Sequence, residues 1–160
     1  MRTITMIILH CSATKAGHRY TFRQCRQDHL KRGYKDIGYH YYITQDGQVH
    51  EGRPLWKEGA HCRGHNRHSI GICYEGGLDL LGLPADTRTP AQRQSLRALL
   101  THLHGLFPRA IILGHRDLSP DRNGDGRITP TEWLKQCPCF DAMEDYDDLQ
   151  PLDLYEMPSV

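Results

Sequence analysis

The chain has 160 residues, 38% of them hydrophobic and 24% charged, with a formal net charge of +1. This length favours a single soluble domain with its own core, and no apolar run approaches the roughly 20 residues that would cross a membrane. The charge is unevenly distributed: residues 141–160 hold seven acidic side chains and no Lys or Arg, so residues 1–140 carry 20 basic against 12 acidic side chains. The basic body permits an anionic partner, although a solvated surface with a counter-charged tail explains the same balance.

Strand-like and helical patterns alternate along the chain. Capping boxes at Thr21/Gln24 and Thr89/Gln92 predict the starts of two helices, and the dipeptide Asp46-Gly47 predicts a tight hairpin turn. This order is typical of one α/β domain with a mixed central sheet flanked by helices. The predicted strands are 6–10, 69–77 and 109–115, the hairpin is 39–52, and the helices are 21–33 and 89–107.

The first twelve residues, MRTITMIILHCS, contain a short apolar run but no cleavage-site pattern. We therefore expect no signal peptide, synthesis in the cytoplasm, and a buried strand at IIL. The six cysteines are interpreted mostly as thiols or ligands rather than disulfides. Cys25 and Cys73 lie in helical and strand-like patterns, which favours buried, unreactive thiols.

Two histidines end two of the predicted strands, in the sequences ILH and ILGH. His10 and His115 can meet at one sheet edge, and Cys137 follows after a short excursion. Two imidazoles and one thiolate form a suitable zinc set that leaves a fourth position for water, as catalytic zinc requires. For any one of eleven histidines, a surface or hydrogen-bonded role is the alternative. Cys139 leaves the choice of sulfur open, since it lies two residues from Cys137.

The segment DRNGDGRITPTE, residues 121–132, satisfies the calcium-loop pattern D-x-[DN]-x-[DN]-G-x₅-E. Gly126 supplies the sharp bend that this pattern needs. The alternative to a calcium loop is a surface turn that binds no metal. Pro120 and Pro138 preclude a complete EF-hand, so we expect a structural calcium loop rather than a sensor. The predicted calcium ligands are Asp121, Asn123, Asp125, Arg127 through its carbonyl, and Glu132.

Five segments, which together cover nearly all of residues 6–141, resemble one known family. The chain is similar to the zinc-dependent N-acetylmuramoyl-L-alanine amidases of the type 2 amidase and peptidoglycan-recognition superfamily, especially the amidase-type phage lysozymes. In short phage relatives the segments before and after residues 121–134 adjoin almost directly, which marks those residues as an insert. The matching segments are HCSATK (10–15), DIGYHYYITQDGQVHEGR (36–53), GAHCRGHNRHSIGICYEGG (59–77), TPAQRQSLRALL (89–100) and KQCPCFD (135–141).

The resemblance implies a zinc enzyme that hydrolyses the amide bond between N-acetylmuramic acid and L-alanine in peptidoglycan. The family cysteine precedes a proline and follows a lysine by two residues, which selects Cys137 over Cys139. By this resemblance the zinc ligands are His10, His115 and Cys137, the residues needed for hydrolysis are Tyr39 and Lys135, and His61 and Asn66 line or shape the substrate groove. Asp117 is a candidate acceptor for a ligand imidazole, with a carboxylate in a strand-end turn as the alternative.

The expected organisation is an amidase domain at residues 1–141, containing the calcium-loop insert, and an acidic tail at residues 142–160. We expect this tail to be mobile or loosely docked and dispensable for the chemistry. The expected partner is peptidoglycan, reached after release or delivery, with no nucleic acid, no membrane insertion and a monomeric chain. Bound calcium is expected to start a short helix at residues 131–135.

Three other functions remain open from the sequence. The chain could be a peptidoglycan-binding module without activity, although the full set of ligands with Tyr39 and Lys135 disfavours this. It could regulate another macromolecule, or it could be a cysteine hydrolase that uses Cys11 or Cys139.

Overall fold

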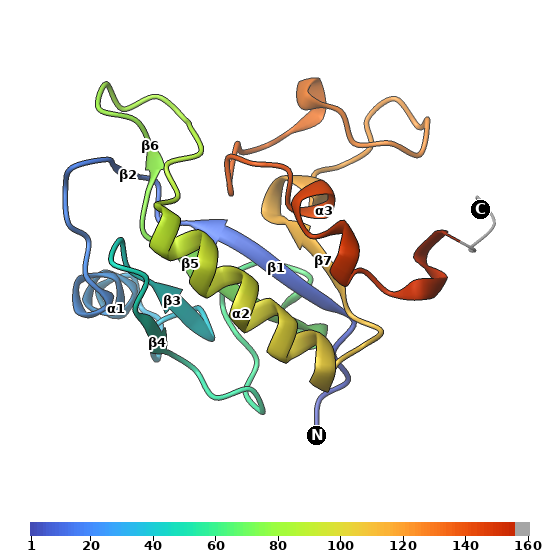
Figure 1. Cartoon of the computed structure of the whole chain (residues 1–160), viewed down its shortest axis with the longest axis horizontal. Coiled ribbons are helices and arrows are strands. Elements are labelled where there is room, and N and C mark those ends of the chain that lie inside the picture. The colour runs from blue at the N-terminus through green and yellow to red at the C-terminus, as the bar shows by residue number, and fades with distance from the viewer. Residues whose placement is uncertain (156–160) are drawn as a thin grey trace.

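The computed structural model describes residues 1–155 as one α/β domain (Figure 1). None of the helices in this range is long and apolar enough to cross a membrane. The strands are β1 (Met6–Cys11), β2 (Thr14–Lys15), β3 (Tyr41–Ile43), β4 (Val49–Glu51), β5 (Ser69–Tyr74), β6 (Gly77–Leu78) and β7 (Ile111–Gly114). The helices are α1 (Phe22–Lys31), α2 (Pro90–Leu106) and α3 (Ala142–Asp145), with 3₁₀ turns at Asn66–His68, His115–Leu118, Pro130–Glu132, Asp147–Leu149 and Leu152–Tyr155.

The central sheet has five strands in the order β4-β3-β5-β1-β7. Strand β1 runs parallel to both β5 and β7, β3 runs parallel to β5, and β3 and β4 form the antiparallel hairpin. The predicted mixed α/β fold is therefore confirmed. The small parallel ribbon of β2 and β6 is an element that the sequence patterns do not predict.

Local sequence signals explain where the two long helices begin. In both predicted capping boxes the threonine hydroxyl accepts a backbone N–H three residues on, and the glutamine side chain accepts the threonine N–H. These bonds satisfy N–H groups that would otherwise lack partners in the first turn. On α2, the leucine stripe packs into the core through Leu96, Leu100 and Leu103, each at most 1% exposed.

The two faces of the sheet are covered by different helices. Ile7 and Leu9 of β1 join the α2 leucines in the larger core cluster, whereas Cys73 of β5 packs with Cys25 of α1 in a smaller one. Burial of Cys25 and Cys73 matches the prediction of unreactive structural thiols. Because side chains alternate along a strand, His10 faces the α1 side of the sheet, opposite Leu9. This alternation places the candidate site between the sheet and α1.

The beginning of the acidic tail is packed, contrary to the expectation of a mobile or loosely docked segment. Tyr146 and Leu149 are buried in the larger cluster. The Gln150 side chain accepts the Ile112 N–H at 2.9 Å and donates to the Ile112 carbonyl at 2.7 Å, which pairs the outer edge of β7. Residues 142–150 are thus part of the domain, and residues 156–160 of the predicted tail lie outside the described chain.

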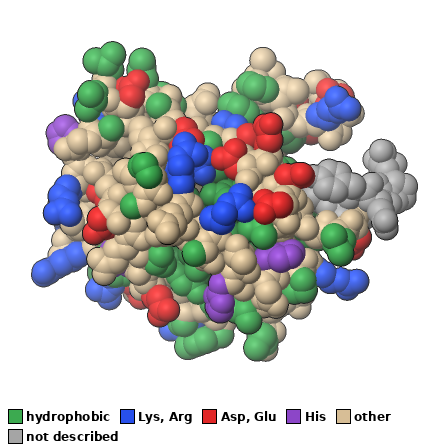
Figure 2. Space-filling model, viewed as in Figure 1, with side chains coloured by type: hydrophobic (Ala, Val, Ile, Leu, Met, Phe, Trp, Pro, Cys, Tyr) green, Lys and Arg blue, Asp and Glu red, His purple; other side chains and the backbone are tan. Residues whose placement is uncertain are grey.

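The acidic side chains of this segment meet the arginines of α2 and the loop before it. Arg88, with 2% of its side chain exposed, pairs with both Asp86 and Asp145, and Arg97 pairs with Asp148. Figure 2 shows basic and acidic side chains adjoining on this face. The charge asymmetry seen in the sequence is therefore partly neutralised by ion pairs within the fold.

Candidate metal centre and active site

The register of β1 and β7 brings two distant histidines together. Leu9 lies opposite Gly114 in the parallel pair. The next residue in β1 is His10, and the residue that directly follows β7 is His115. Their ring centroids are 4.7 Å apart, at an interplanar angle of 61°. The pairing of β1 with β7 thus brings together two histidines that are far apart in the chain.

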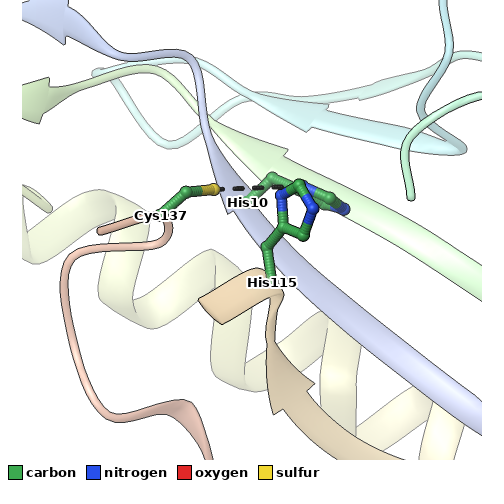
Figure 3. A group of neighbouring side chains, drawn as sticks. All are labelled: His10, His115 and Cys137. Carbon is green, nitrogen blue, oxygen red and sulfur yellow. Dashed lines mark hydrogen bonds between the residues drawn. The ribbon is translucent and has the colours of Figure 1, made fainter. Parts of the chain in front are cut away.

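The third side chain comes from the segment before α3. The donor atoms of His10, His115 and Cys137 all lie within 4.8 Å of one another, and Figure 3 shows the three side chains converging. The Cys137 Sγ is 3.9 Å from His10 Nδ1. Tetrahedral zinc with bonds of about 2.0–2.3 Å places such donors roughly 3.5 Å apart. The residues present therefore fit a zinc ion.

The backbone favours Cys137 over Cys139 as the ligand sulfur. The Cys11 N–H donates to Cys137 Sγ at 3.3 Å, a bond that would stabilise a thiolate. Cys139 Sγ instead lies 3.9 Å from Cys11 Sγ. The hydrogen bond to Cys137 raises the pKa of Cys11 to about 12, and the hydrogen bond to Cys11 raises the pKa of Cys139. Neither free thiol has the lowered pKa of a cysteine nucleophile.

The imidazole of His10 is almost fully buried, at 2% exposure. Burial lowers its pKa well below the usual value, and His61, His115 and Lys135 lower it further. A neutral imidazole keeps a lone pair available for a cation. The other ring nitrogen, Nε2, lies 2.8 Å from His61 Nδ1.

The three side chains open onto a cavity of about 580 Å³. Tyr39, Lys135, His61 and Asn66, which the resemblance assigns to catalysis or to the groove, all line it. The Tyr39 ring centroid is 5.3 Å from that of His10, and burial raises the pKa of Tyr39 well above its usual value. Its hydroxyl therefore stays protonated at neutral pH and can donate a hydrogen bond.

Comparison with known proteins identifies the family. Residues 1–132 match the family model described as N-acetylmuramoyl-L-alanine amidase. An uncharacterised protein of Haemophilus influenzae is 52% identical over 109 residues, which cover 68% of this chain and 94% of that protein. The endolysin of Escherichia phage T7 is 39% identical over 135 residues, 84% of this chain and 80% of that protein. The chain belongs to the N-acetylmuramoyl-L-alanine amidase family.

A solved structure supports the same relationship within the amidase family. The N-acetylmuramoyl-L-alanine amidase LysC from Clostridium intestinale superimposes with a TM-score of 0.69 at 26% identity, covering 92% of this chain and 83% of that one. The family model ends at residue 132, before Cys137. The assignment of the third ligand therefore depends on the sequence resemblance and on the geometry of the cluster.

Two residues assigned to the amidase groove have structural contacts of their own. Both ring nitrogens of His61 contact other residues of the protein: Nδ1 lies 2.8 Å from His10 Nε2, and Nε2 lies 3.1 Å from the Ser69 hydroxyl. The Asn66 Oδ1 accepts the backbone N–H groups of His61 and Cys62 at 2.9 and 3.0 Å. Both residues line the cavity and are held by contacts inside the protein, and their role in a substrate groove stays a prediction.

Asp117 caps a turn instead of orienting an imidazole. Its Oδ2 accepts the Gly114 N–H at 2.7 Å, and burial raises its pKa. Its hydrogen bond therefore supports the alternative interpretation, a carboxylate in the turn that follows β7.

The insert forms a loop that is closed by its own backbone. Asp121 accepts the N–H groups of Gly124 and Gly126, and Glu132 accepts those of Arg122, Asn123 and Thr129. Among residues 1–155, His10, His115 and Cys137 are the only cluster with three gathered donor groups, so the carboxylates of the insert do not converge in this way. A 3₁₀ turn at Pro130–Glu132 replaces the expected helix at residues 131–135. The geometry of the insert does not support the predicted structural calcium loop, and calcium binding stays a prediction.

Several residues of the cavity are not found by sequence reasoning. His29, Arg32 and Tyr34, at the end of α1 and just after it, line one side, and Arg63 lines another. His29, Arg32 and Tyr34 lie outside the segments that resemble the family, and their place in the cavity depends on how α1 packs on the sheet; Arg63 lies inside such a segment, but the resemblance assigns it no role. With Lys135 they give the cavity three Lys or Arg side chains and no carboxylate.

Proposed function

We propose that the chain is a zinc-dependent N-acetylmuramoyl-L-alanine amidase that cleaves the bond between N-acetylmuramic acid and L-alanine in peptidoglycan. The observation that carries this proposal is the convergence of His10, His115 and Cys137 in a cavity of a chain from this family. Relatives named endolysins are consistent with a substrate in the cell wall.

The bound zinc would polarise the scissile carbonyl and lower the pKa of a water molecule. His10, His115 and Cys137 would hold it and leave one position for that water. Tyr39 donates a hydrogen bond from its neutral hydroxyl, either to position the water or to pass a proton to the leaving amine. Lys135 supplies a positive charge next to the oxygen that becomes negative during the attack.

The charge of the cavity also fits the substrate. Arg32, Arg63 and Lys135 line it, and no carboxylate does. Stem peptides of peptidoglycan carry free carboxylates, which basic side chains attract. Because one chain supplies the whole metal cluster, we propose that the enzyme acts as a monomer. We also propose that it reaches the wall after release or delivery from the cytoplasm.

Digestion of purified peptidoglycan, with and without a chelator, tests this function. We expect new L-alanine amino termini, no new reducing sugar ends, loss of activity with the chelator and recovery with zinc. New reducing ends would indicate a glycosidase. Activity that resists the chelator but not alkylation would indicate a cysteine hydrolase, and binding without cleavage would indicate a recognition module.

A further inference from the structure

The nitrogen of His10 that faces away from the metal cluster has a dedicated partner. The Nδ1 atom faces Cys137 Sγ at 3.9 Å, and Nε2 lies 2.8 Å from His61 Nδ1. If Nδ1 gives its lone pair to a cation, the ring proton of neutral His10 must reside on Nε2. His10 then donates to His61, so His61 Nδ1 carries no proton.

This proton arrangement continues to a third residue. With Nδ1 as acceptor, the neutral His61 ring carries its proton on Nε2, which lies 3.1 Å from the hydroxyl oxygen of Ser69. Ser69 is fully buried at the start of β5. His10 therefore donates to His61, and His61 donates to Ser69. One neutral tautomer of each imidazole satisfies both hydrogen bonds.

The surrounding backbone fixes the orientation of the His61 ring. A Cβ added at Gly59 would lie 2.5 Å from His61 Cδ2, and one added at Gly71 would lie 2.5 Å from His61 Cγ. Both distances are shorter than any real contact, so only glycine leaves room for the ring at these two positions. The Asn66 side-chain oxygen accepts the backbone N–H of His61 and so holds this part of the backbone in place. The ring thus sits in a fitted slot with its Nδ1 aimed at His10.

We infer that His61 is a positioning residue for the metal ligand His10, rather than a contact for the substrate. It accepts the Nε2 proton of His10 and so fixes both the tautomer and the ring orientation in which Nδ1 faces the cation. The inference rests on the proposed zinc site but not on the identity of the substrate. Partners of this kind typically change metal affinity by about 10- to 100-fold.

A matched pair of substitutions separates hydrogen bonding from packing. His61→Asn keeps an acceptor close to the position of Nδ1, whereas His61→Leu has a similar size and no acceptor. Zinc affinity is measured by competition with a chelator, and the visible spectrum of the cobalt-substituted protein reports the ligand geometry. We expect about 10- to 100-fold weaker zinc binding and an altered cobalt spectrum for His61→Leu, with His61→Asn within a few-fold of the parent.

Other outcomes would overturn the inference. Equal losses of zinc affinity in both variants would assign His61 to packing alone. Unchanged zinc affinity with a raised KM would assign it to the substrate. If His61→Leu does not fold, Ser69→Ala removes the acceptor at the end of the chain of hydrogen bonds and should weaken zinc binding by a few-fold; an unchanged affinity there would also count against the inference. Because metal affinity is measured without substrate, a failure of the amidase assignment leaves this result readable.

Discussion

The cluster of His10, His115 and Cys137 and the calcium-loop motif at residues 121–132 of the insert both carry side chains of types that bind metals, but their donor atoms are used differently. In the cluster the donors face one another, and neighbouring groups hold other atoms of the ligands, as His61 does for His10. In the insert the carboxylates themselves accept backbone N–H groups of the loop. The first arrangement leaves its donors for a cation, whereas the second closes a loop without one.

The difference shows what a motif in the sequence can establish. The insert matches its pattern within twelve consecutive residues, yet such side chains also satisfy a turn by themselves. The three residues of the cluster come from separate segments: the register of β1 and β7 brings the two imidazoles together, and Cys137 joins them from the segment before α3. Long-range convergence is therefore the stronger indication of a metal site.

The largest expected effect is the loss of the third ligand of the proposed zinc site. Cys137→Ser should lose bound zinc and amidase activity together, because a serine hydroxyl replaces the thiolate. Cys139→Ser is the matched control, since its sulfur lies beside Cys11 and outside the cluster. Zinc content by elemental analysis, about one per chain in the parent, and release of L-alanine amino termini measure both effects. A metal-free Cys139→Ser protein would show that the other sulfur is the ligand.

Removing the two proposed catalytic groups should separate chemistry from metal binding. Tyr39→Phe and Lys135→Ala keep all three zinc donors, so zinc content should stay normal. Each should lower the amidase rate by about 10²-fold or more, as the loss of one transition-state contact often does. Turnover close to that of the parent in both variants would remove their assigned roles while leaving the metal cluster in place.

The C-terminal segment contrasts with the insert in packing. Leu149 is 8% exposed in the core, whereas Leu134, the last residue of the insert, is 62% exposed. Leu149→Ala should therefore lower the free energy of unfolding by about 2–4 kcal/mol, and Leu134→Ala by less than about 0.5 kcal/mol. Truncation after Met143 should destabilise the protein further, since Tyr146 and Gln150 are also lost. Denaturant unfolding checks each value, and a parent-like truncated protein would mean that residues 144–160 contribute little to the fold.

As the pH falls, the buried imidazoles should reduce the free energy of unfolding before the carboxylates of the insert do. Burial lowers the pKa of His40 to about 4, from 6.5 for an unperturbed histidine. The unfolded chain takes up this proton first as the pH falls from 6.5 towards 4, so stability decreases in that window, by about 2 kcal/mol at pH 5. Glu132 titrates lower, because the Thr129 N–H depresses its pKa below 4.5.

Denaturant unfolding at pH 7 and pH 5, with a chelator present, measures this effect. His40→Gln should reduce the difference between the two pH values, although it also costs stability at pH 7 by disturbing bonds to Gly71 and Lys57. Exposed His102→Gln is the control and should behave like the parent. An undiminished difference in His40→Gln would assign the acid sensitivity to other groups.

How far the sequence predicts this molecule depends on whether a signal is local. Capping boxes, the hairpin around Asp46-Gly47 and the leucine stripe of α2 are local, and each is confirmed. The turn of the hairpin is longer than a tight two-residue turn, because Gly47 has a positive φ and Asp46 does not. The contact between His61 and His10 joins residues 51 positions apart, and it depends on a ring orientation that no spacing specifies. The docking of Gln150 on Ile112 could not be predicted for a similar reason. The acidic composition of this segment indicates an exposed tail, although three side chains among residues 146–150 are buried.

The smallest expected effect is that of calcium on the insert. Because Asp121 and Glu132 already accept backbone N–H groups, a cation adds only the difference between its bonds and those. At a concentration ten times a millimolar-range Kd, linkage to the folded state gives about 1.4 kcal/mol, or a rise in Tm of about 4 °C for a domain of this size. The insert joins the metal site through Trp133 on Arg116 and through the Leu134 N–H on Ser119. Loosening the insert in Asp121→Ala/Asp125→Ala should therefore also lower the amidase rate modestly.

Thermal unfolding with calcium, with magnesium as the control, measures the shift in Tm. A parent whose Tm ignores calcium, together with a double variant that melts and cuts like it, would show that residues 121–132 are a surface loop.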